Sequence, residues 1–395
     1  MDILKKVDEI YDELVDIRRD FHKNPELSQN EFRTQKKIQD YLNKWGIENH
    51  VCAETGVVGI IKGRNPGKTI GLRGDIDALP IKEKNSQLYC SVNAGVMHAC
   101  GHDAHTAILL GVGKIMKEMA DSEESIEGNV KLFFQPAEET IGGGKRMVQE
   151  GCMTNPDVDY VLGLHVMPYI DAGKVELKYG KLNASTDSIK ITLKGKQAHG
   201  AYPDRGIDAI AMAGNVITSL QTIVSRNISP LNSVVISLGK ISGGVKDNVI
   251  ADEVKISGTL RALDDDTRSF AKHRIADIVK NTAIAFGGEG EVDFHDGYQA
   301  LINNDEVVDV IKENAEKLLG RENIVFKEFP SLGAEDFSYF SDVAKGAFFH
   351  LGCGNSTKGI TSPIHTDCFD IDEECLKTGV LLQVNNVLSL INKRT

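Results

Sequence analysis

The sequence has no run of about 18 uncharged apolar residues, the length that a helix needs to span a bilayer. Its first segment, MDILKKVDEIYDELVDIRRDF, alternates charged and apolar residues at helical spacing. That spacing predicts an amphipathic helix, and it is not typical of a signal peptide or a membrane span. We therefore expect no membrane partner.

Basic residues are outnumbered by acidic residues. Lysine and arginine number 45 against 57 aspartates and glutamates, so the formal net charge is −12. An acidic chain repels polyanions, and nucleic acid is therefore not an expected partner.

Cysteine is sparse and scattered. The seven cysteines are an odd number spread through 395 residues, which does not suggest a disulfide framework. This usage fits a reducing compartment, and we expect a cytoplasmic protein. Internal repeats and low-complexity tracts are absent too. A chain of this length with 41% hydrophobic residues predicts two or three globular domains with ample core.

The first half alternates predicted helices and strands, which is typical of an α/β fold. Apolar strands are expected at 57–63, 69–77, 129–135 and 160–166. Ser28 with Glu31 matches a capping box ahead of a helix that ends at Gly46.

The middle of the chain changes pattern. Its elements follow the order β-α-β-β-α-β, the ferredoxin-like signature, and predict a compact domain over 183–296. The remainder returns to helix, strand and helix. We therefore expect one α/β domain, formed by 1–182 and 297–395, that is interrupted by this insert.

Polar residues follow several of the predicted strands. In RGDIDALP, Arg73, Asp75 and Asp77 alternate and would share one face, and ligands of open α/β sheets gather at such carboxyl ends. An aspartate-rich turn is the alternative. In FFQPAEET, Glu138 and Glu139 follow an apolar strand, where two adjacent carboxylates are costly without a cation between them. One could bind a metal ion while the other acts as general base; a solvated loop that begins a helix is the alternative.

The segment MHACGHDAHT contains three histidines and a cysteine. Cys100 and His102 would leave a loop together as ligands suited to zinc or a similar ion. Alternatively, Asp103 caps the following helix, Cys100 is a small buried apolar residue, and His98 and His105 are hydrogen-bonded packing residues. A thiolate nucleophile with a histidine base is a third interpretation, but it leaves the paired glutamates unexplained. We expect Asp103 to cap the helix in any case.

Two further histidines complete a metal-binding set, although each could be structural. His165 follows an apolar strand, and His365 lies in the loop SPIHTDCFD. With Cys100, His102 and Glu139 they outnumber the protein ligands of one tetrahedral site. The set therefore suggests two ions that share a water.

These segments together resemble a known family. The sequences RGDIDALP, MHACGHDAHTAILLG, FQPAEE, GLHVMP, GKQAHGAYP, DNVIAD, GAEDFSYF and HTDCFDIDE occur in order from about residue 70 to 375, and HKNPELSQNEF near the start matches too. The chain is similar to the two-metal amidohydrolases that include hippurate hydrolase, plant auxin-conjugate hydrolases, N-acetyldiaminopimelate deacetylase and bacterial N-acyl-amino-acid hydrolases of the thermostable-carboxypeptidase type.

The resemblance implies a zinc-peptidase-like catalytic domain with a ferredoxin-like insert, which serves as a lid and often dimerises. It implies Glu138 as general base and Asp77 as a residue that orients the site from behind a ligand. In the wider group of related proteins a histidine ligand stands at the position of Asp75. The Cys-x-His pair marks the branch in which the ligand set differs, so the resemblance does not imply Asp75 as a ligand. The implied metal ligands are Cys100, His102, Glu139, His165 and His365.

The resemblance also implies substrate contacts from the insert. His199 would stabilise the developing oxyanion, and Asn248 and Arg261 would hold the carboxylate of the substrate. The forked guanidinium of Arg261 suits that task, but Arg261 could equally be a surface residue of a strand with no role in binding.

The expected activity is hydrolysis of the amide bond of N-acyl amino acids, of N-acetyl or N-benzoyl type. The expected cofactors are two divalent ions per subunit, zinc or manganese, with cobalt or nickel as alternatives. A homodimer or higher homo-oligomer through the insert is expected. A dipeptidase or carboxypeptidase on the same scaffold is the near alternative, and a non-catalytic metal-dependent binding module is the distant one.

Overall fold

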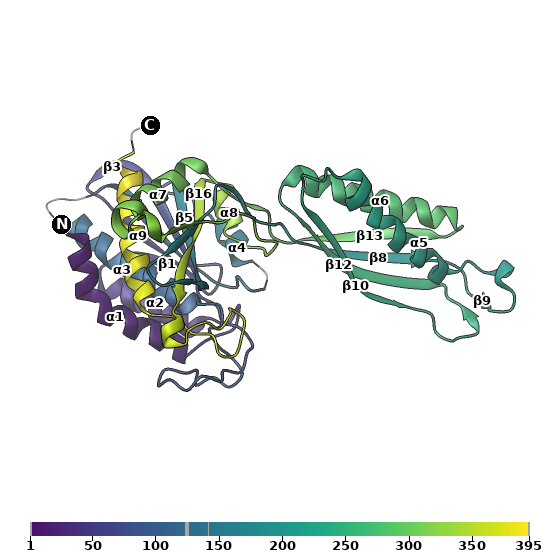
Figure 1. The fold of residues 1–395 in the computed structure, drawn as a ribbon, viewed down its shortest axis with the longest axis horizontal. Coiled ribbons are helices and arrows are strands. Elements are labelled where there is room, and N and C mark those ends of the chain that lie inside the picture. The colour runs from purple at the N-terminus through teal and green to yellow at the C-terminus, as the bar shows by residue number, and fades with distance from the viewer. Residues whose placement is uncertain (1, 123–125, 141, 394–395) are drawn as a thin grey trace. The chain divides into compact units, whose positions relative to one another are not determined.

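The computed structural model describes residues 2–122, 126–140 and 142–393. Contacts between Cα atoms divide the chain into two units (Figure 1). Unit 1 comprises Met1–Leu182, Ile302–Phe329 and Asp336–Thr395, and unit 2 comprises Asn183–Leu301 and Pro330–Glu335. Among the described helices, none is both long and apolar enough to cross a bilayer.

An eight-stranded mixed sheet forms the centre of unit 1. Its order is β1-β2-β4-β3-β5-β16-β6-β15. The central strands β4, β3, β5 and β16 run parallel to one another, whereas β1 and β2 pair antiparallel at one side and β6 pairs antiparallel with β16 at the other. The strands are β1 (Glu48–Cys52), β2 (Gly56–Lys62), β3 (Asn65–Asp75), β4 (Glu127–Gln135), β5 (Tyr160–Asp171), β6 (Val175–Leu177), β15 (Ile324–Phe326) and β16 (Lys345–Gly354).

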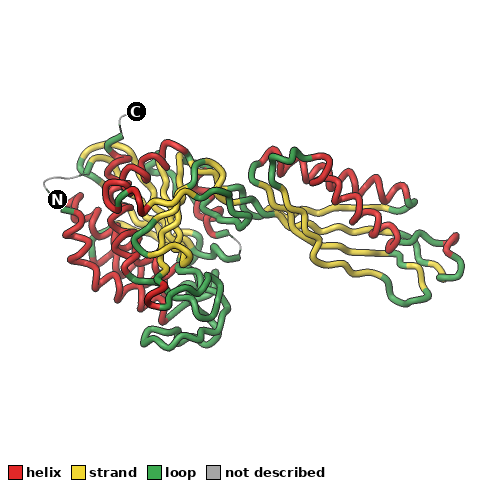
Figure 2. The backbone as a smooth tube through the Cα atoms, viewed as in Figure 1, coloured by secondary structure: helices red, strands yellow, loops and turns green. Residues whose placement is uncertain are grey.

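Helices cover both faces of this sheet (Figures 1 and 2). On one face α1, α3 and α9 pack against one another, and α4 and α8 lie on the opposite face. The helices of unit 1 are α1 (Ile3–Lys23), α2 (Phe32–Lys44), α3 (His102–Asp121), α4 (Gly143–Gln149), α7 (Asp305–Leu319), α8 (Ser338–Ser341) and α9 (Glu374–Ile391).

The double covering explains why the central strands are apolar on both sides. In β4, Leu132 and Phe134 belong to the main core with α1, α3 and α9. Phe133 between them points the other way and stacks on Phe340 of α8, with ring centroids 5.3 Å apart. Continuous burial of this kind is typical of parallel strands, and it leaves the polar residues at the strand ends.

Unit 2 has its own sheet and core. The strand order is β10-β12-β8-β13, and every neighbouring pair is antiparallel. Helices α5 and α6 pack on this sheet through a separate apolar cluster. The elements in chain order are β8 (Asp187–Lys194), β9 (Ala198–His199), α5 (Ala209–Thr222), β10 (Val234–Gly243), β11 (Val249–Ile250), β12 (Glu253–Ala262), α6 (Asp265–Ala285) and β13 (Glu289–Asp296). The four-stranded sheet with its two helices is the ferredoxin-like arrangement, and the predicted α/β fold class is confirmed.

The predicted capping box at Ser28 and Glu31 is wrong. Helix α2 begins at Phe32, and its first-turn amides at Arg33 and Thr34 donate to the carboxylate of Glu26, at 3.0 and 2.8 Å. Ser28 and Glu31 instead bind groups distant in sequence, described below. Those partners are buried amides and carboxylates. Leaving one of them without a hydrogen bond would cost more free energy than leaving a solvated helix end uncapped.

The predicted helix cap at Asp103 is wrong as well. Helix α3 begins at His102, and Gly101 occupies the N-cap with φ +88°. Asp103 lies in the first turn, fully buried, where Arg18 Nε donates to its Oδ2 at 2.7 Å. A buried guanidinium from α1 therefore engages the carboxylate that was expected to cap its own helix.

Candidate metal centre

The candidate site lies where the parallel strands of unit 1 end. β3 ends at Asp75 and β4 at Gln135, and the predicted carboxylates follow them directly. Cys100 and His102 flank the left-handed Gly101 at the start of α3, and a Cβ atom at Gly101 would lie 2.3 Å from Val166 Cγ2. Glycine is required here for both the positive φ and the close approach to β5.

Cys100 lies between two imidazoles. Its Sγ is 3.3 Å from His165 Nε2 and 3.2 Å from His365 Nε2. The His365 loop is held by its amide, which donates to the Ala99 carbonyl at 2.7 Å, and His365 has φ +61°. A non-glycine residue in this region is strained, and such strain clusters at functional sites.

Glu139 connects this group to His102. Its Oε1 lies 3.1 Å from His365 Nε2 and 3.9 Å from His102 Nε2. Both Glu139 Oε1 and His102 Nε2 are buried and have no hydrogen-bond partner among the described residues. These two ligand atoms, which make no hydrogen bond across the gap between them, fit a cation at that place.

The ligand atoms form overlapping triads, each within 4.8 Å. Two of these triads have Cys100 in common, and two have Glu139 in common. The triads that contain only predicted ligands and Glu138 are Cys100–His102–His165, Cys100–Glu139–His365 and His102–Glu138–Glu139, and another triad is Asp75–His102–His105. All five predicted ligands and Glu138 are thus brought together, in a pattern with room for more than one ion.

The charges of the cluster favour a cation. Burial lowers the pKa of His102, but the carboxylates of Asp75, Asp77 and Glu139 outweigh it and raise that pKa to about 10. Burial, with Glu139 and Glu138 nearby, raises the pKa of the Cys100 thiol well above its usual range. Carboxylates that hold protons on an imidazole and a thiol would hold a divalent ion in their place, and this donor set suits zinc-like ions.

Asp77 ties the ligand segments together. Its Oδ1 is 3.2 Å from His102 Nδ1, and its Oδ2 accepts from Ser28 Oγ at 2.7 Å and from the Glu139 amide at 3.1 Å. Burial raises the pKa of Asp77, but these hydrogen bonds outweigh it and lower that pKa. The ionised carboxylate therefore leaves His102 Nε2 to face the cluster.

Glu138 follows a strained turn. Ala137 has φ +54°, and its amide donates to Glu31 Oε1 at 2.9 Å. Thr55 Oγ1 donates to the other oxygen of Glu31 at 2.6 Å. The buried Glu31 carboxylate thus holds the turn that brings Glu138 and Glu139 to the ligand group.

Asp75 uses both oxygens elsewhere. Its Oδ2 accepts from Arg73 Nη1 at 2.5 Å, and its Oδ1 lies 2.5 Å from His105 Nδ1. Burial raises the pKa of Asp75, but Arg73, His102 and His105 outweigh it and lower that pKa well below its usual value. The predicted strand over 69–77 in fact ends at Asp75, so Arg73 and Asp75 share a face while Asp77 lies on the following loop.

Sequence reasoning missed several residues that support the ligands. Ser28 and Glu31 match a local capping pattern, and His105 lies outside the predicted ligand set. Their partners are distant in the chain: Glu31 and Ala137 are separated by 106 residues. No local spacing signals such contacts, although HKNPELSQNEF lies within the family resemblance.

The predicted substrate residues all lie in unit 2. His199 and Asn248 are close: the Gly200 amide donates to the Asn248 carbonyl at 2.8 Å, and β9 pairs with β11 beside them. The exposed His199 accepts at Nδ1 from the Ala201 amide at 3.0 Å. Arg261 lies on β12, and its Nη1 donates to the Leu332 carbonyl at 2.7 Å.

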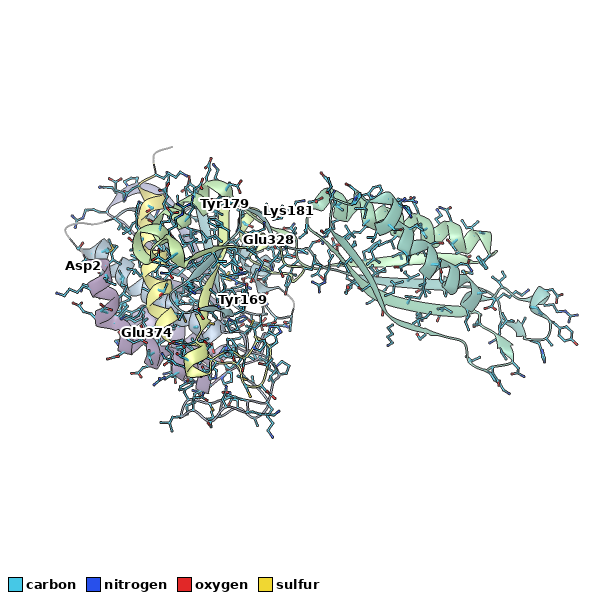
Figure 3. The ribbon with its side chains drawn as sticks, in the orientation of Figure 1. Asp2, Tyr169, Tyr179, Lys181, Glu328 and Glu374 are labelled. Carbon is cyan, nitrogen blue, oxygen red and sulfur yellow. The ribbon has the colours of Figure 1, made fainter. Side chains whose placement is uncertain are left out.

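Another charged group in unit 1 is distinct from the ligand cluster. Tyr169, labelled in Figure 3, donates its hydroxyl to Glu176 at 2.7 Å. His350 Nδ1 and Lys327 Nζ also contact Glu176, at 2.7 and 3.2 Å. These side chains satisfy one another and need no ligand.

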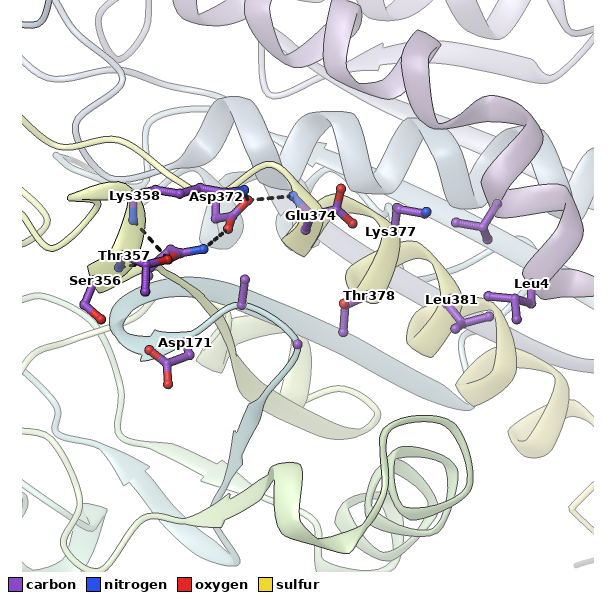
Figure 4. Close-up of a pocket in the computed structure, with 15 residues that line it drawn as sticks. Leu4, Asp171, Ser356, Thr357, Lys358, Asp372, Glu374, Lys377, Thr378 and Leu381 are labelled. Atoms are coloured by element: carbon purple, nitrogen blue, oxygen red, sulfur yellow. Dashed lines mark hydrogen bonds and ion pairs between the residues drawn. The ribbon is translucent and has the colours of Figure 1, made fainter.

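A cavity of about 600 Å³ also lies in unit 1, away from the predicted residues (Figure 4). Leu4 of α1 and Leu381 of α9 form its apolar side. Lys358, on its polar side, donates to Asp372 at 2.9 Å. None of the candidate metal ligands lines this cavity.

Comparisons with known proteins identify a family and several similar chains. The model of a family described as peptidase family M20/M25/M40 matches residues 71–387. Thermostable carboxypeptidase 2 of Saccharolobus solfataricus is 40% identical over all of both chains. The N-acetyl-L-cysteine deacetylase of Bacillus subtilis is 40% identical over 92% of this chain and 85% of its own. A solved structure, the YXEP protein of Bacillus subtilis, described as a dinuclear metal binding peptidase from the M20 family, is 30% identical with a TM-score of 0.84 over 98% of this chain and 100% of its own.

Proposed function

Because the chain belongs to peptidase family M20/M25/M40, we propose that it is a metal-dependent hydrolase that cleaves the amide bond of N-acyl amino acids. The observation that carries the proposal is the set of overlapping triads at the ends of the parallel strands, with Glu138 beside them. The similar N-acetyl-L-cysteine deacetylase supports the acyl-amino-acid class. The similarity to thermostable carboxypeptidase 2 supports carboxypeptidase activity as the second candidate function.

We propose that the five clustered side chains hold two divalent ions, zinc or manganese in the first instance. Their ligands are Cys100, His102, Glu139, His165 and His365. Bound there, such ions supply polarisation of the amide carbonyl and a water whose pKa is lowered toward neutrality.

Glu138 is proposed as the general base. Its carboxylate takes the proton of the attacking water and returns it to the leaving amine. Asp77 keeps His102 in the orientation that the cluster requires. In unit 2, His199 is proposed to stabilise the oxyanion and Asn248 and Arg261 to bind the carboxylate of the substrate.

We also propose that the protein is cytoplasmic and forms a homo-oligomer through the unit 2 domain. The compartment is supported by the seven cysteines, which are all free thiols. The oligomer rests on the family resemblance of the inserted domain.

The decisive experiment is a substrate panel. Apoprotein is reconstituted separately with zinc, manganese and cobalt, and its rates on N-acetyl and N-benzoyl amino acids are compared with those on free dipeptides. Faster turnover of the acyl amino acids supports the proposal, whereas faster turnover of dipeptides favours the carboxypeptidase. A metal-loaded protein that is inert to the whole panel favours a binding module.

The general base is tested by Glu138→Gln. Loss of the carboxylate is expected to lower kcat by about 10²–10⁴-fold while the metal content stays at the wild-type level. Glu127→Gln, an exposed residue at the opposite end of β4, is the control and should keep full activity. Full turnover of metal-loaded Glu138→Gln would show that the base is another residue.

A further inference from the structure

The backbone N–H and C=O groups of Val166 each contact a buried imidazole. The carbonyl accepts from His165 Nδ1 at 2.8 Å, and the amide donates to His105 Nε2 at 2.9 Å. The first contact places the proton of His165 on Nδ1, so its Nε2 lone pair faces Cys100 Sγ. The orientation of His165 therefore depends on how the backbone at Val166 is held.

The second contact fixes the tautomer of His105. A backbone amide can only donate, so His105 Nε2 must be an acceptor and the ring proton lies on Nδ1. That proton is directed at Asp75 Oδ1, 2.5 Å away. The other tautomer would set an N–H of His105 against the N–H of Val166.

Asp75 is itself held rigidly from behind. Arg73 donates from Nη1 to Asp75 and from Nη2 to Asp336, the latter at 2.7 Å. Gln135 accepts from Arg73 Nε at 2.8 Å and donates to Asp336 Oδ2 at 2.7 Å. All of these side chains are at most 2% exposed, so water cannot replace the contacts. A continuous buried series of hydrogen bonds thus runs from Asp336 to the proposed ligand His165.

We propose that His105 is a positioning residue that orients His165 toward the metal centre by fixing the backbone at Val166, with Asp75 favouring the tautomer of His105 that does so. The inference rests on the proposed function, since it needs His165 to be a ligand. It assigns a role to a histidine that lies outside the ligand set. It also gives Asp75, between Arg73 and His105, a role in the site that does not require it to bind an ion.

The test separates the two contacts of His105. In His105→Gln the amide oxygen can accept from Val166 as Nε2 does, whereas in His105→Asn the shorter amide can only replace Nδ1 toward Asp75. Metal affinity is measured by competition with a chelator, and the visible spectrum of the cobalt-loaded protein reports ligand geometry. His105→Asn is expected to lose about 10–100-fold in affinity, with a changed spectrum, while His105→Gln stays closer to wild type.

Asp75→Asn is a second, isosteric variant. Its amide donor would oppose the Nδ1 proton of His105 and favour the wrong tautomer, so we expect the same loss as in His105→Asn. His350→Asn is the matched control, because it removes a buried imidazole of unit 1 that contacts Glu176 rather than Val166. Urea unfolding in the presence of a chelator shows whether each variant is folded.

The outcomes distinguish the two proposals. A wild-type protein that binds no ion contradicts the proposed function itself. If wild type binds two ions and both His105→Asn and Asp75→Asn match it, the positioning role is overturned. An equal loss in His105→Gln and His105→Asn also overturns it, because the contact with Val166 would then not be the one that matters.

Discussion

At the scale of single residues, Gly101 decides how closely Cys100 and His102 approach β5. Its φ of +88° lies in the left-handed region, and its missing side chain leaves room for Val166. Cys100 and His102 flank this glycine and bring their ligand atoms within 4.8 Å of one another. The local conformation and the ligand geometry are thus set by the same residue.

Gly101→Ala is expected to disturb both the local conformation and the ligand geometry. The left-handed conformation costs about 1–2 kcal/mol for a residue with a Cβ atom, and the contact with Val166 adds to that. Urea unfolding of the metal-free protein should show the loss of stability, and chelator competition should show weaker metal binding. Gly359→Ala is the control, because Gly359 has φ +73° with no atom within 4 Å of its Cβ position. Equal behaviour of the two variants would mean that the approach to Val166 is unimportant.

Residue types predicted the centre of the site better than its surroundings. Cysteine, histidine and glutamate in the positions of Cys100, His102 and Glu139 are chemically conspicuous, and the structure brings them together. Ser28 and Glu31 are ordinary loop residues whose contacts form only in the folded chain. The assignment of roles to individual ligands stays a prediction until metal-loaded protein is studied.

At the scale of elements, α1 contributes more than an amphipathic face. Arg18 is fully buried, and its guanidinium binds Asp103 on α3, Asp370 and Glu373. Its neighbour Arg19 binds the same Glu373 from the surface, at 2.6 Å. The sequence DIRRDF shows two adjacent arginines, and nothing in it indicates which one is buried, because that depends on where α3 and the segment before α9 pack.

The two arginines should therefore behave differently when replaced. Arg18→Met removes the guanidinium from the buried carboxylates of Asp103 and Asp370, and removing one partner of a buried pair costs about 3–5 kcal/mol. Arg19→Met removes an exposed pair worth about 1 kcal/mol or less. Urea denaturation of both variants provides the comparison. Comparable losses would contradict the assigned burial of Arg18.

At the scale of the whole molecule, the chain has two separate cores. The larger apolar cluster belongs to unit 1 and the smaller to unit 2. The five proposed ligands all lie in unit 1. The βαββαβ order of unit 2 was predictable because its strands alternate in period two, whereas the return of 330–335 to unit 2 depends on contacts that no local pattern encodes.

Metal removal should therefore act on one unit only. We expect calorimetry to show two unfolding transitions, of which chelation lowers the one that belongs to unit 1. Each ion at 100 times its Kd would stabilise that unit by about 2.7 kcal/mol.

Leu260→Ala identifies the other transition. Leu260 is fully buried in the core of unit 2, and its truncation typically costs about 2–5 kcal/mol. The substitution should shift the transition that does not respond to metal. A single transition that moves as a whole with both treatments would contradict independent cores.

The sequence separation of the contacts in the site also determines when the site can form during folding. Cys100 and His365 are separated by 265 residues, Arg73 and Asp336 by 263, and Arg18 and Glu373 by 355. Loops of this length close late, because their entropy cost precedes any gain from the contact. Four of the five proposed ligands precede the insert, and only His365 follows it. The complete centre therefore forms only when both halves of unit 1 have met across the insert that separates them in sequence.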